Sequence, residues 1–133
     1  MVHSPSNRAL YLRAGCMVFV DRGQILAIER DFDPLDLGVP GGLVDDGEDC
    51  LDAAVREAYE EAGLTVFSCA PLCEWVSPDG GLVRTYVATE WAGSPRGSRE
   101  GSLRWVRPSE LPSGQFERES RRVVRCLRER GLV

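Results

Sequence analysis

Apolar and polar positions follow two different periods along the chain, and the change of period separates expected strands from expected helices. Two runs of strand-forming residues, 14–20 and 24–29, flank the turn signal Asp21-Arg22-Gly23, which predicts a β-hairpin. A short extended piece covers 37–39. The remaining expected strands are 65–75, 82–91 and one around 103–106, the first two joined by the turn cluster 77–81.

Two segments show the helical period. The first is expected to begin near Gly47 with Asp46 as its N-cap, and to end at Gly63, because glycine suits a left-handed residue after a helix. Its expected apolar stripe consists of Leu51, Ala54, Val55, Ala58 and Ala62. The second helix is expected over 116–130 and has a stripe of Val123, Val124 and Leu127.

This order of elements predicts an α/β fold of layered type, in which helices cover a mixed or mostly antiparallel sheet. One helix precedes the main strand meander and one follows it. The length of 133 residues suits a single domain over 1–133, and the polar stretch 1–7 is expected to be a loose end.

Composition excludes several classes of function. The net charge of −5 argues against a nucleic-acid polymer as partner, and no apolar run approaches the about 20 residues of a membrane-spanning helix. The five cysteines are scattered, and the single histidine, His3, argues against a nucleophilic triad. Free thiols and the lack of a signal-peptide core together predict a cytoplasmic protein.

The first helix carries an acidic stripe. Glu57, Glu60 and Glu61 fall on one face, where like charges three and four residues apart repel each other. Two of them lie near the helix C-terminus, which the helix dipole also disfavours. A solvated acidic face is the simple interpretation, whereas a hard divalent cation with oxygen ligands would remove both penalties.

The residues around this stripe resemble the Nudix box, G-x5-E-x7-R-E-U-x-E-E-x-G-U, where U is a bulky aliphatic residue. The matching residues are Gly42, Glu48, Arg56, Glu57, Glu60, Glu61, Gly63 and Leu64. Ala58 departs from the pattern, but it belongs to the apolar stripe, so the departure concerns packing. Leu37 stands where many members of the family have tryptophan. The segment 86–105 also resembles the later half of short MutT-type Nudix proteins, with Glu100 in its loop.

The resemblance implies an α/β/α Nudix sandwich and hydrolysis of a nucleoside diphosphate linked to another moiety. It implies that Mg²⁺, or Mn²⁺, is held by the Gly42 carbonyl with Glu57, Glu60 and Glu61. Arg56 is interpreted as an orienting partner of these carboxylates. The base that activates water is left open between Glu57, Glu48 and Glu100, because crowding of carboxylates raises their pKa values in ways that the sequence does not resolve.

Three functions follow as alternatives. The first is cleavage of a (d)NTP, or an oxidised dNTP, to a nucleoside monophosphate and pyrophosphate by attack of water on phosphorus. The second is hydrolysis of ADP-ribose, for which Pro78 lies near a proline of some such enzymes, or of a dinucleoside polyphosphate. The third is a non-catalytic Nudix domain that binds nucleotides as a sensor. The partner is a small nucleotide in each case, Phe32 and Leu37 are candidates for its base pocket, and the protein is expected to be a monomer or a homodimer.

Overall fold

The computed structural model describes residues 13–76, 78 and 80–133. The expected loose end at 1–7 with His3, and Ser77 and Asp79 of the expected turn, lie outside the described residues. Within that part of the chain, no helix is both long and apolar enough to cross a membrane.

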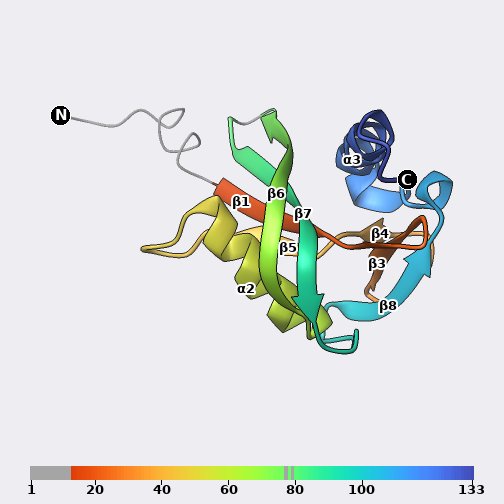
Figure 1. Ribbon diagram of the computed structural model, residues 1–133, viewed down its shortest axis with the longest axis horizontal. Helices are drawn as coiled ribbons and strands as arrows, with labels where there is room; N and C mark the ends of the chain where they lie inside the picture. The colour runs from red at the N-terminus through yellow and green to blue at the C-terminus, as the bar shows by residue number, and fades with distance from the viewer. Residues whose placement is uncertain (1–12, 77, 79) are drawn as a thin grey trace.

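The secondary structure follows the expected order (Figure 1). The strands are β1 (Arg13–Val18), β2 (Val20–Asp21), β3 (Gln24–Arg30), β4 (Leu37–Gly38), β5 (Gly41–Leu43), β6 (Thr65–Val76), β7 (Leu82–Ala92) and β8 (Gly101–Val106). The helices are α2 (Cys50–Ala62), α3 (Glu117–Glu129) and two 3₁₀ turns, η1 (Pro108–Glu110) and η2 (Gly114–Phe116).

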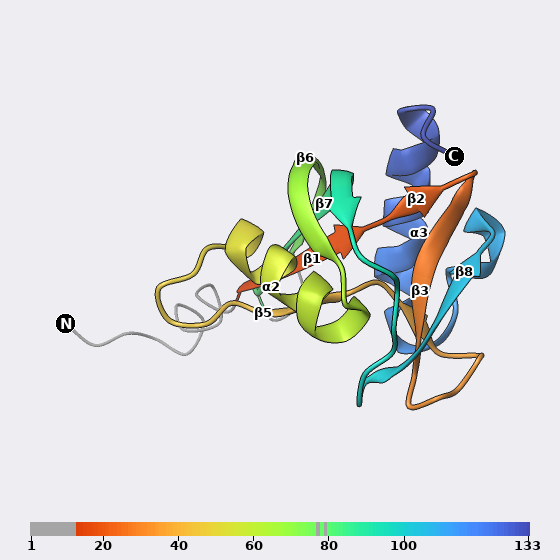
Figure 2. The same cartoon turned by 60° about the horizontal axis from the view of Figure 1, so that its bottom comes forward.

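Two sheets form the centre of the molecule. The first is mixed and has the order β5-β1-β7-β6, in which β1 runs parallel to β7 and the other pairs are antiparallel. In the second, β2, β4 and β8 all pair with β3 in antiparallel fashion. Helices α2 and α3 lie on different sides of these strands (Figures 1 and 2). The expected α/β class, with a mixed sheet flanked by helices, is therefore confirmed.

The predicted hairpin over 14–20 and 24–29 is wrong for most of its length. Only Val20 and Asp21 pair with β3, and the earlier residues leave to form β1 in the other sheet, parallel to β7. Strand β1 is buried on both faces, so its apolar run contains no information about which strand it pairs with. By contrast, the expected antiparallel pair 65–75 and 82–91 is confirmed as β6 and β7.

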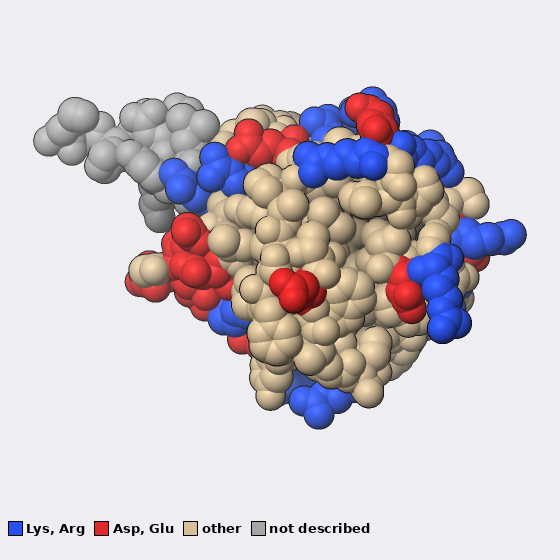
Figure 3. All heavy atoms as spheres, in the orientation of Figure 1, with Lys and Arg blue, Asp and Glu red and all other residues tan. Residues whose placement is uncertain are grey.

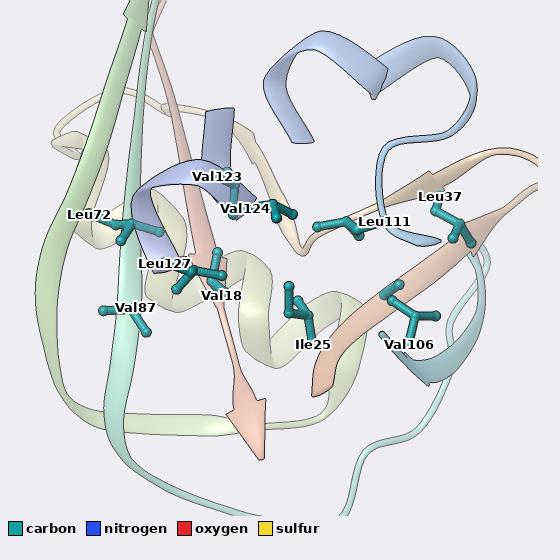
Figure 4. Close-up of a cluster of buried hydrophobic side chains, with 11 residues drawn as sticks. Val18, Ile25, Leu37, Leu72, Val87, Val106, Leu111, Val123, Val124 and Leu127 are labelled. Atoms are coloured by element: carbon teal, nitrogen blue, oxygen red, sulfur yellow. The ribbon is translucent and has the colours of Figure 1, made fainter. Parts of the chain in front are cut away.

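Alternate residues of β1 and β3 build two cores. Val18 and Ile25 belong to the core under α3, which also contains Val123, Val124 and Leu127 (Figure 4). Met17, Phe19 and Leu26 point into the second core, against Ala54, Ala58 and Ala62 of α2. This alternation is the physical reason for the three layers, because each face of the strands is covered by one helix.

Helix α2 begins three residues later than predicted, at Cys50. Asp49, not Asp46, is the N-cap: its Oδ1 accepts from the Asp52 N–H at 2.8 Å, and Asp52 Oδ2 accepts from the Asp49 N–H at 3.2 Å. This reciprocal capping box satisfies two N–H groups at the start of the helix. Leu51 was assigned to the apolar stripe but is exposed, and Ala53 is buried instead. Gly63 ends the helix with φ 70°, as expected.

Gly15 sets the distance between β1 and α2. A Cβ on this residue would overlap the Cys50 carbonyl and would lie 2.8 Å from the Ala54 backbone nitrogen. The first turn of the helix therefore lies directly on the strand backbone, where only glycine fits. This contact holds the acidic stripe of α2 at one height above the sheet.

Candidate active site

Helix α2 places Glu57 and Glu61 against the glycine strand β5, and Glu60 accepts a hydrogen bond from Arg56 beside them. Their environments differ: Glu61 is 5% exposed, whereas the side chains of Glu57 and Glu60 are 16% and 53% exposed. The backbone N–H of Gly41 donates to Glu61 Oε1 at 2.7 Å. A carboxylate near the end of the helix is therefore bonded to strand β5, at a residue 20 positions earlier in the chain.

The two glycines of β5 leave room on opposite sides of the strand. A Cβ on Gly42 would lie 2.7 Å from the Glu57 carboxyl carbon, so only glycine lets this carboxylate lie against the backbone. A Cβ on Gly41 would instead lie 2.5 Å from the Cys16 sulfur. The strand is thus a thin partition with Glu57 on one side and Cys16 on the other.

Arg56 connects the acidic residues to one another. Its Nε and Nη2 donate to the two oxygens of Glu48 at 2.8 and 3.0 Å, and its Nη1 donates to Glu57 Oε1 at 2.6 Å and to Glu60 Oε2 at 3.2 Å. Nη2 also donates to the Leu43 carbonyl at 3.0 Å. One planar guanidinium therefore orients three carboxylates and the end of β5.

We expect Arg56→Lys to lower the free energy of unfolding by about 1–2 kcal/mol, because a lysine ammonium cannot reproduce the two-pronged contact with Glu48 while also reaching Glu57. Urea unfolding followed by circular dichroism measures this loss. Arg84→Lys is the matched control, since Arg84 pairs with Glu74 at an exposed site and should leave the urea midpoint of unfolding unchanged. Equal effects of the two substitutions would contradict the special role of Arg56.

The pKa values of the carboxylates at this site are shifted in opposite directions. Burial, assisted by the charges of Glu57 and Glu100, raises the pKa of Glu61 to about 7, although the Gly41 N–H opposes the shift. Burial also raises the pKa of Glu57, against the opposing hydrogen bond from Arg56. The pKa of Glu48 is lowered, chiefly by its hydrogen bond from Arg56 and also by the Asp45 N–H. Glu57 and Glu61 therefore need an added positive charge, and Glu48 does not.

Glu100 approaches the site from another part of the chain. It precedes β8, its backbone carbonyl accepts from the Asp31 N–H at 3.0 Å, and its half-exposed carboxylate lies 3.8 Å from Arg30 Nη2. Its charge acts on Glu61, as the raised pKa of Glu61 records. The structure therefore brings Glu48, Glu57 and Glu60 together around Arg56, holds Glu61 on the Gly41 N–H, and places Glu100 at their margin.

The donor set fits a hard divalent cation. Among the residues that the structure describes, no three His, Cys, Asp or Glu side chains form a preformed metal-binding group. However, all the converging donors are oxygens, the ligands that Mg²⁺ and Mn²⁺ prefer, and two of the carboxylates have raised pKa values because they are crowded and buried. A cation held by Glu57, Glu60 and Glu61 with the Gly42 carbonyl would relieve that crowding.

A cavity of about 280 Å³ lies on the other side of β5, between the mixed sheet and α3. Its walls are mostly apolar, with polar groups from Arg30, Thr85, Glu119 and Ser120. The Arg30 guanidinium lies 4.7 Å above the ring of Phe116, which also lines the cavity. A small apolar cavity with a few converging polar groups is the usual form of a site for an organic ligand.

The cavity was not identified by sequence reasoning. Phe32 and Leu37, the two candidates for a base pocket, do not line it: Leu37 is 1% exposed in the core and Phe32 is 64% exposed. One signal was present in the sequence, because Ser120 falls in the apolar stripe of α3 with Val123 and is buried there. A small polar residue in a buried stripe indicates that the stripe borders something other than core.

Charge on the surface is divided between the two helices. Figure 3 shows acidic side chains gathered at the loop that leads into α2, and arginines gathered over α3. The acidic group comes from Asp45, Asp46, Glu48 and Asp49.

The five free cysteines include Cys16 in the cavity wall, where burial, assisted by Glu61, raises the pKa of the thiol to about 12. That thiol is therefore a neutral part of the wall.

Comparisons with known proteins identify the family of this chain. A family model described as NUDIX domain matches residues 10–127. A Bacillus subtilis (strain 168) protein whose name proposes 8-oxo-dGTP diphosphatase activity is 31% identical over 110 residues, which cover 80% of this chain and 73% of that protein. An RNA pyrophosphohydrolase of Bradyrhizobium sp. (strain ORS 278) is 40% identical over 63 residues, which cover 47% of this chain and only 36% of that protein.

Among solved structures, the fold is similar to that of a MutT NUDIX hydrolase from Burkholderia pseudomallei. The TM-score is 0.73 at 26% identity, and the match covers 87% of this chain and 97% of the other. The similarity therefore extends over both sheets and both helices, and is not confined to the acidic helix.

Proposed function

Because the chain belongs to the Nudix family, we propose that it is a Mg²⁺-dependent pyrophosphohydrolase that cleaves a (d)NTP, or an oxidised dNTP, to a nucleoside monophosphate and pyrophosphate. Water attacks phosphorus in this reaction, and a P–O bond of the phosphate anhydride breaks. Mn²⁺ is the expected substitute for Mg²⁺, since both are hard cations with oxygen ligands.

One observation carries the proposal: a single glycine strand separates three clustered carboxylates from an apolar cavity. A nucleotide whose base enters the cavity can pass its phosphates over Gly41 and Gly42, where no Cβ obstructs them, toward Glu57 and Glu61. Base and phosphates would then occupy the two sides of β5. The arrangement supports a substrate that has both an apolar ring system and a phosphate chain.

The side chains have separate roles in this proposal. Mg²⁺ bound by Glu57, Glu60, Glu61 and the Gly42 carbonyl would supply the positive charge that neutralises the phosphate oxygens. Arg56 orients Glu57 and Glu60 and keeps Glu48 ionised. Such a positioning residue limits the freedom of the carboxylates before substrate arrives.

The general base has three candidates, and the geometry favours Glu57 over Glu48. Both oxygens of Glu48 accept hydrogen bonds from Arg56, and its pKa is lowered, so it holds a proton poorly. Glu57 has a raised pKa and lies against Gly42. Glu100 remains the third candidate, because it lies near Glu61 and pairs only loosely with Arg30.

A panel of substrates tests the proposal against its alternatives. With Mg²⁺ and added inorganic pyrophosphatase, we expect phosphate release from dGTP or 8-oxo-dGTP, and at least about a 100-fold loss of rate when EDTA removes the cation. The panel also contains ADP-ribose, a dinucleoside tetraphosphate and 5′-triphosphorylated RNA. A preference for ADP-ribose or the dinucleoside would favour the second function named from the sequence.

Metal binding is measured separately from turnover. If the carboxylates bind Mg²⁺, a cation concentration of 100 times its Kd should raise the free energy of unfolding by about 2.7 kcal/mol. Unchanged hydrolysis in EDTA would refute the role of the metal. Tight nucleotide binding without any cleavage would instead favour a sensor domain.

A further inference from the structure

Helix α3 and the end of β6 enclose a second hollow, of about 390 Å³, which shares no lining residue with the cavity beside β5. Four arginines of the helix line this arginine hollow, together with an apolar wall from the strand. The residues are Arg118, Arg121, Arg122, Arg125, Trp75 and Val76. Figure 3 shows the arginines gathered over α3. The hollow thus combines concentrated positive charge with an aromatic ring.

The positive charge of the arginine hollow is only partly balanced by carboxylates. Arg121 pairs with Glu117 at 3.4 Å, and Arg125 pairs with Glu129 at 3.9 Å, in both cases at exposed positions. Exposed ion pairs of this kind are weak, so an anionic ligand can compete for both arginines. Arg118 has no carboxylate within ion-pair distance among residues 13–76, 78 and 80–133. The hollow therefore has an excess of positive charge.

Arg122 indicates that a ligand belongs in this hollow. Its Nη1 donates to the Glu74 carbonyl over a long distance, 3.5 Å, and its Nε is buried without a hydrogen-bond partner in the described part of the chain. A buried N–H without an acceptor costs free energy, which a native protein generally recovers through water or a ligand. An arginine on a plain solvated face would instead keep each N–H in water. Nε therefore indicates where an acceptor oxygen of the ligand lies.

We propose that the arginine hollow is a second nucleotide site, which binds a nucleoside di- or triphosphate outside the Nudix site. Phosphate oxygens suit the arginines, because each guanidinium offers its N–H donors in a planar fork. Trp75 is partly buried beside them, and its ring can stack on a base. The inference does not depend on the proposed function, since binding at α3 needs neither a metal nor the carboxylates of α2.

The dimensions of the hollow favour one nucleotide over a longer chain. Its volume of about 390 Å³ lies within the range of small-ligand sites. Arg118, Arg122 and Arg125 lie on successive helical turns that rise about 10 Å in all, so they can contact more than one phosphate of the same ligand. The net charge of −5 also opposes the approach of a long polyanion to the rest of the surface.

Nuclear magnetic resonance of the ¹⁵N-labelled full chain tests the site directly. ADP is added in the presence of EDTA, so that catalysis is not involved. We expect the indole N–H signal of Trp75 and the Nε–H signal of Arg122 to shift and to saturate together. The indole signals of Trp91 and Trp105 should stay in place, because both rings pack against the core under α2. A ligand confined to the cavity beside β5 would not produce this pattern.

Two variants separate the roles of charge and ring. Arg118→Gln should weaken ADP binding at this site about 5-fold, because it removes one charge from the phosphate side. Arg107→Gln is the matched control, since Arg107 is also exposed but does not line the hollow, and it should leave the affinity unchanged. Trp75→Leu, followed through the Arg122 signal, should weaken ADP about 10-fold and leave inorganic tripolyphosphate unaffected.

Three results would overturn the proposal. The first is the absence of any shift of the Trp75 and Arg122 signals at about 1 mM ADP, which needs no variant to fold. The second is equal affinity for tripolyphosphate and ADP, because the ring of Trp75 would then contribute nothing. The third is tighter binding of a 5′-hydroxyl oligouridylate than of ADP, which would make the hollow a contact for single-stranded RNA.

These outcomes are independent of the hydrolysis assay. If ADP shifts both signals but no nucleotide of the panel is cleaved, the second site stands and the proposed hydrolysis is wrong. If nucleotides are cleaved while both signals stay in place, hydrolysis stands and the arginine hollow is not a nucleotide site.

Discussion

Glu57→Gln is expected to lower kcat by about 10²- to 10⁴-fold, which corresponds to about 3–5 kcal/mol of transition-state stabilisation. The amide keeps the shape of the side chain but loses the negative charge and the ability to take up a proton. Glu57 lies against Gly42 and receives a hydrogen bond from Arg56 at 2.6 Å, so its position is set on two sides. Steady-state hydrolysis of the best substrate of the panel measures the loss.

The fold should survive this substitution. Burial and the nearby charge of Glu60 already favour the neutral form of Glu57, so a neutral amide should change the free energy of unfolding by less than about 1 kcal/mol. Glu129→Gln, at an exposed pair on α3, is the control and should keep the full rate. A Glu57→Gln enzyme within tenfold of the normal rate would exclude Glu57 from the reaction.

Gly15→Ala is expected to cause the largest loss of stability among these substitutions, about 3 kcal/mol or more. The new methyl group would meet the backbone of Cys50 and Ala54, which cannot rotate away as a side chain can. Helix α2 would have to move off β1, and the carboxylates of Glu57 and Glu61 would move away from β5 with it. Urea unfolding measures the stability, and the hydrolysis assay measures the displacement.

Gly38→Ala separates this steric effect from the general cost of replacing a strand glycine. Gly38 also has a backbone that any residue can adopt, but its Cβ would have only ordinary contacts, the nearest at 3.5 Å from Phe116. We expect it to change stability by less than about 1 kcal/mol. If Gly15→Ala were equally mild, the height of α2 above β1 would not depend on Gly15.

The chemistry of the site could be predicted from the sequence because it is local. Glu57, Glu60 and Glu61 share a face by helical geometry alone, and Arg56 lies within five residues of all three. The α/β class and the antiparallel pair β6 and β7 followed from periodicity and from one short turn. In each case the residues that interact are close in sequence or repeat at a regular period.

The errors occurred where distant segments decide the outcome. The first apolar run was assigned to a hairpin, but it pairs with β7, some 70 residues away in sequence, as the register of Arg13 with Leu82 shows. Asp46 was predicted to be the N-cap of α2, but the helix starts at Cys50. Its first turn, at Cys50 and Ala54, lies against Gly15 of β1. The local preference of residues for strand or helix does not predict contacts between segments that are distant in the sequence.

The sequence by itself determined the family, the acidic stripe and the layered fold, because helical and strand periods are properties of neighbouring residues. Only the tertiary structure decided that Gly41 and Gly42 form a thin partition between the carboxylates and a cavity. It also decided that Arg30 and Glu119, 89 positions apart by their residue numbers, line that same cavity. That cavity is assembled from β1, β3, β5, β7 and α3, and such an assembly depends on packing between elements that are distant in the sequence.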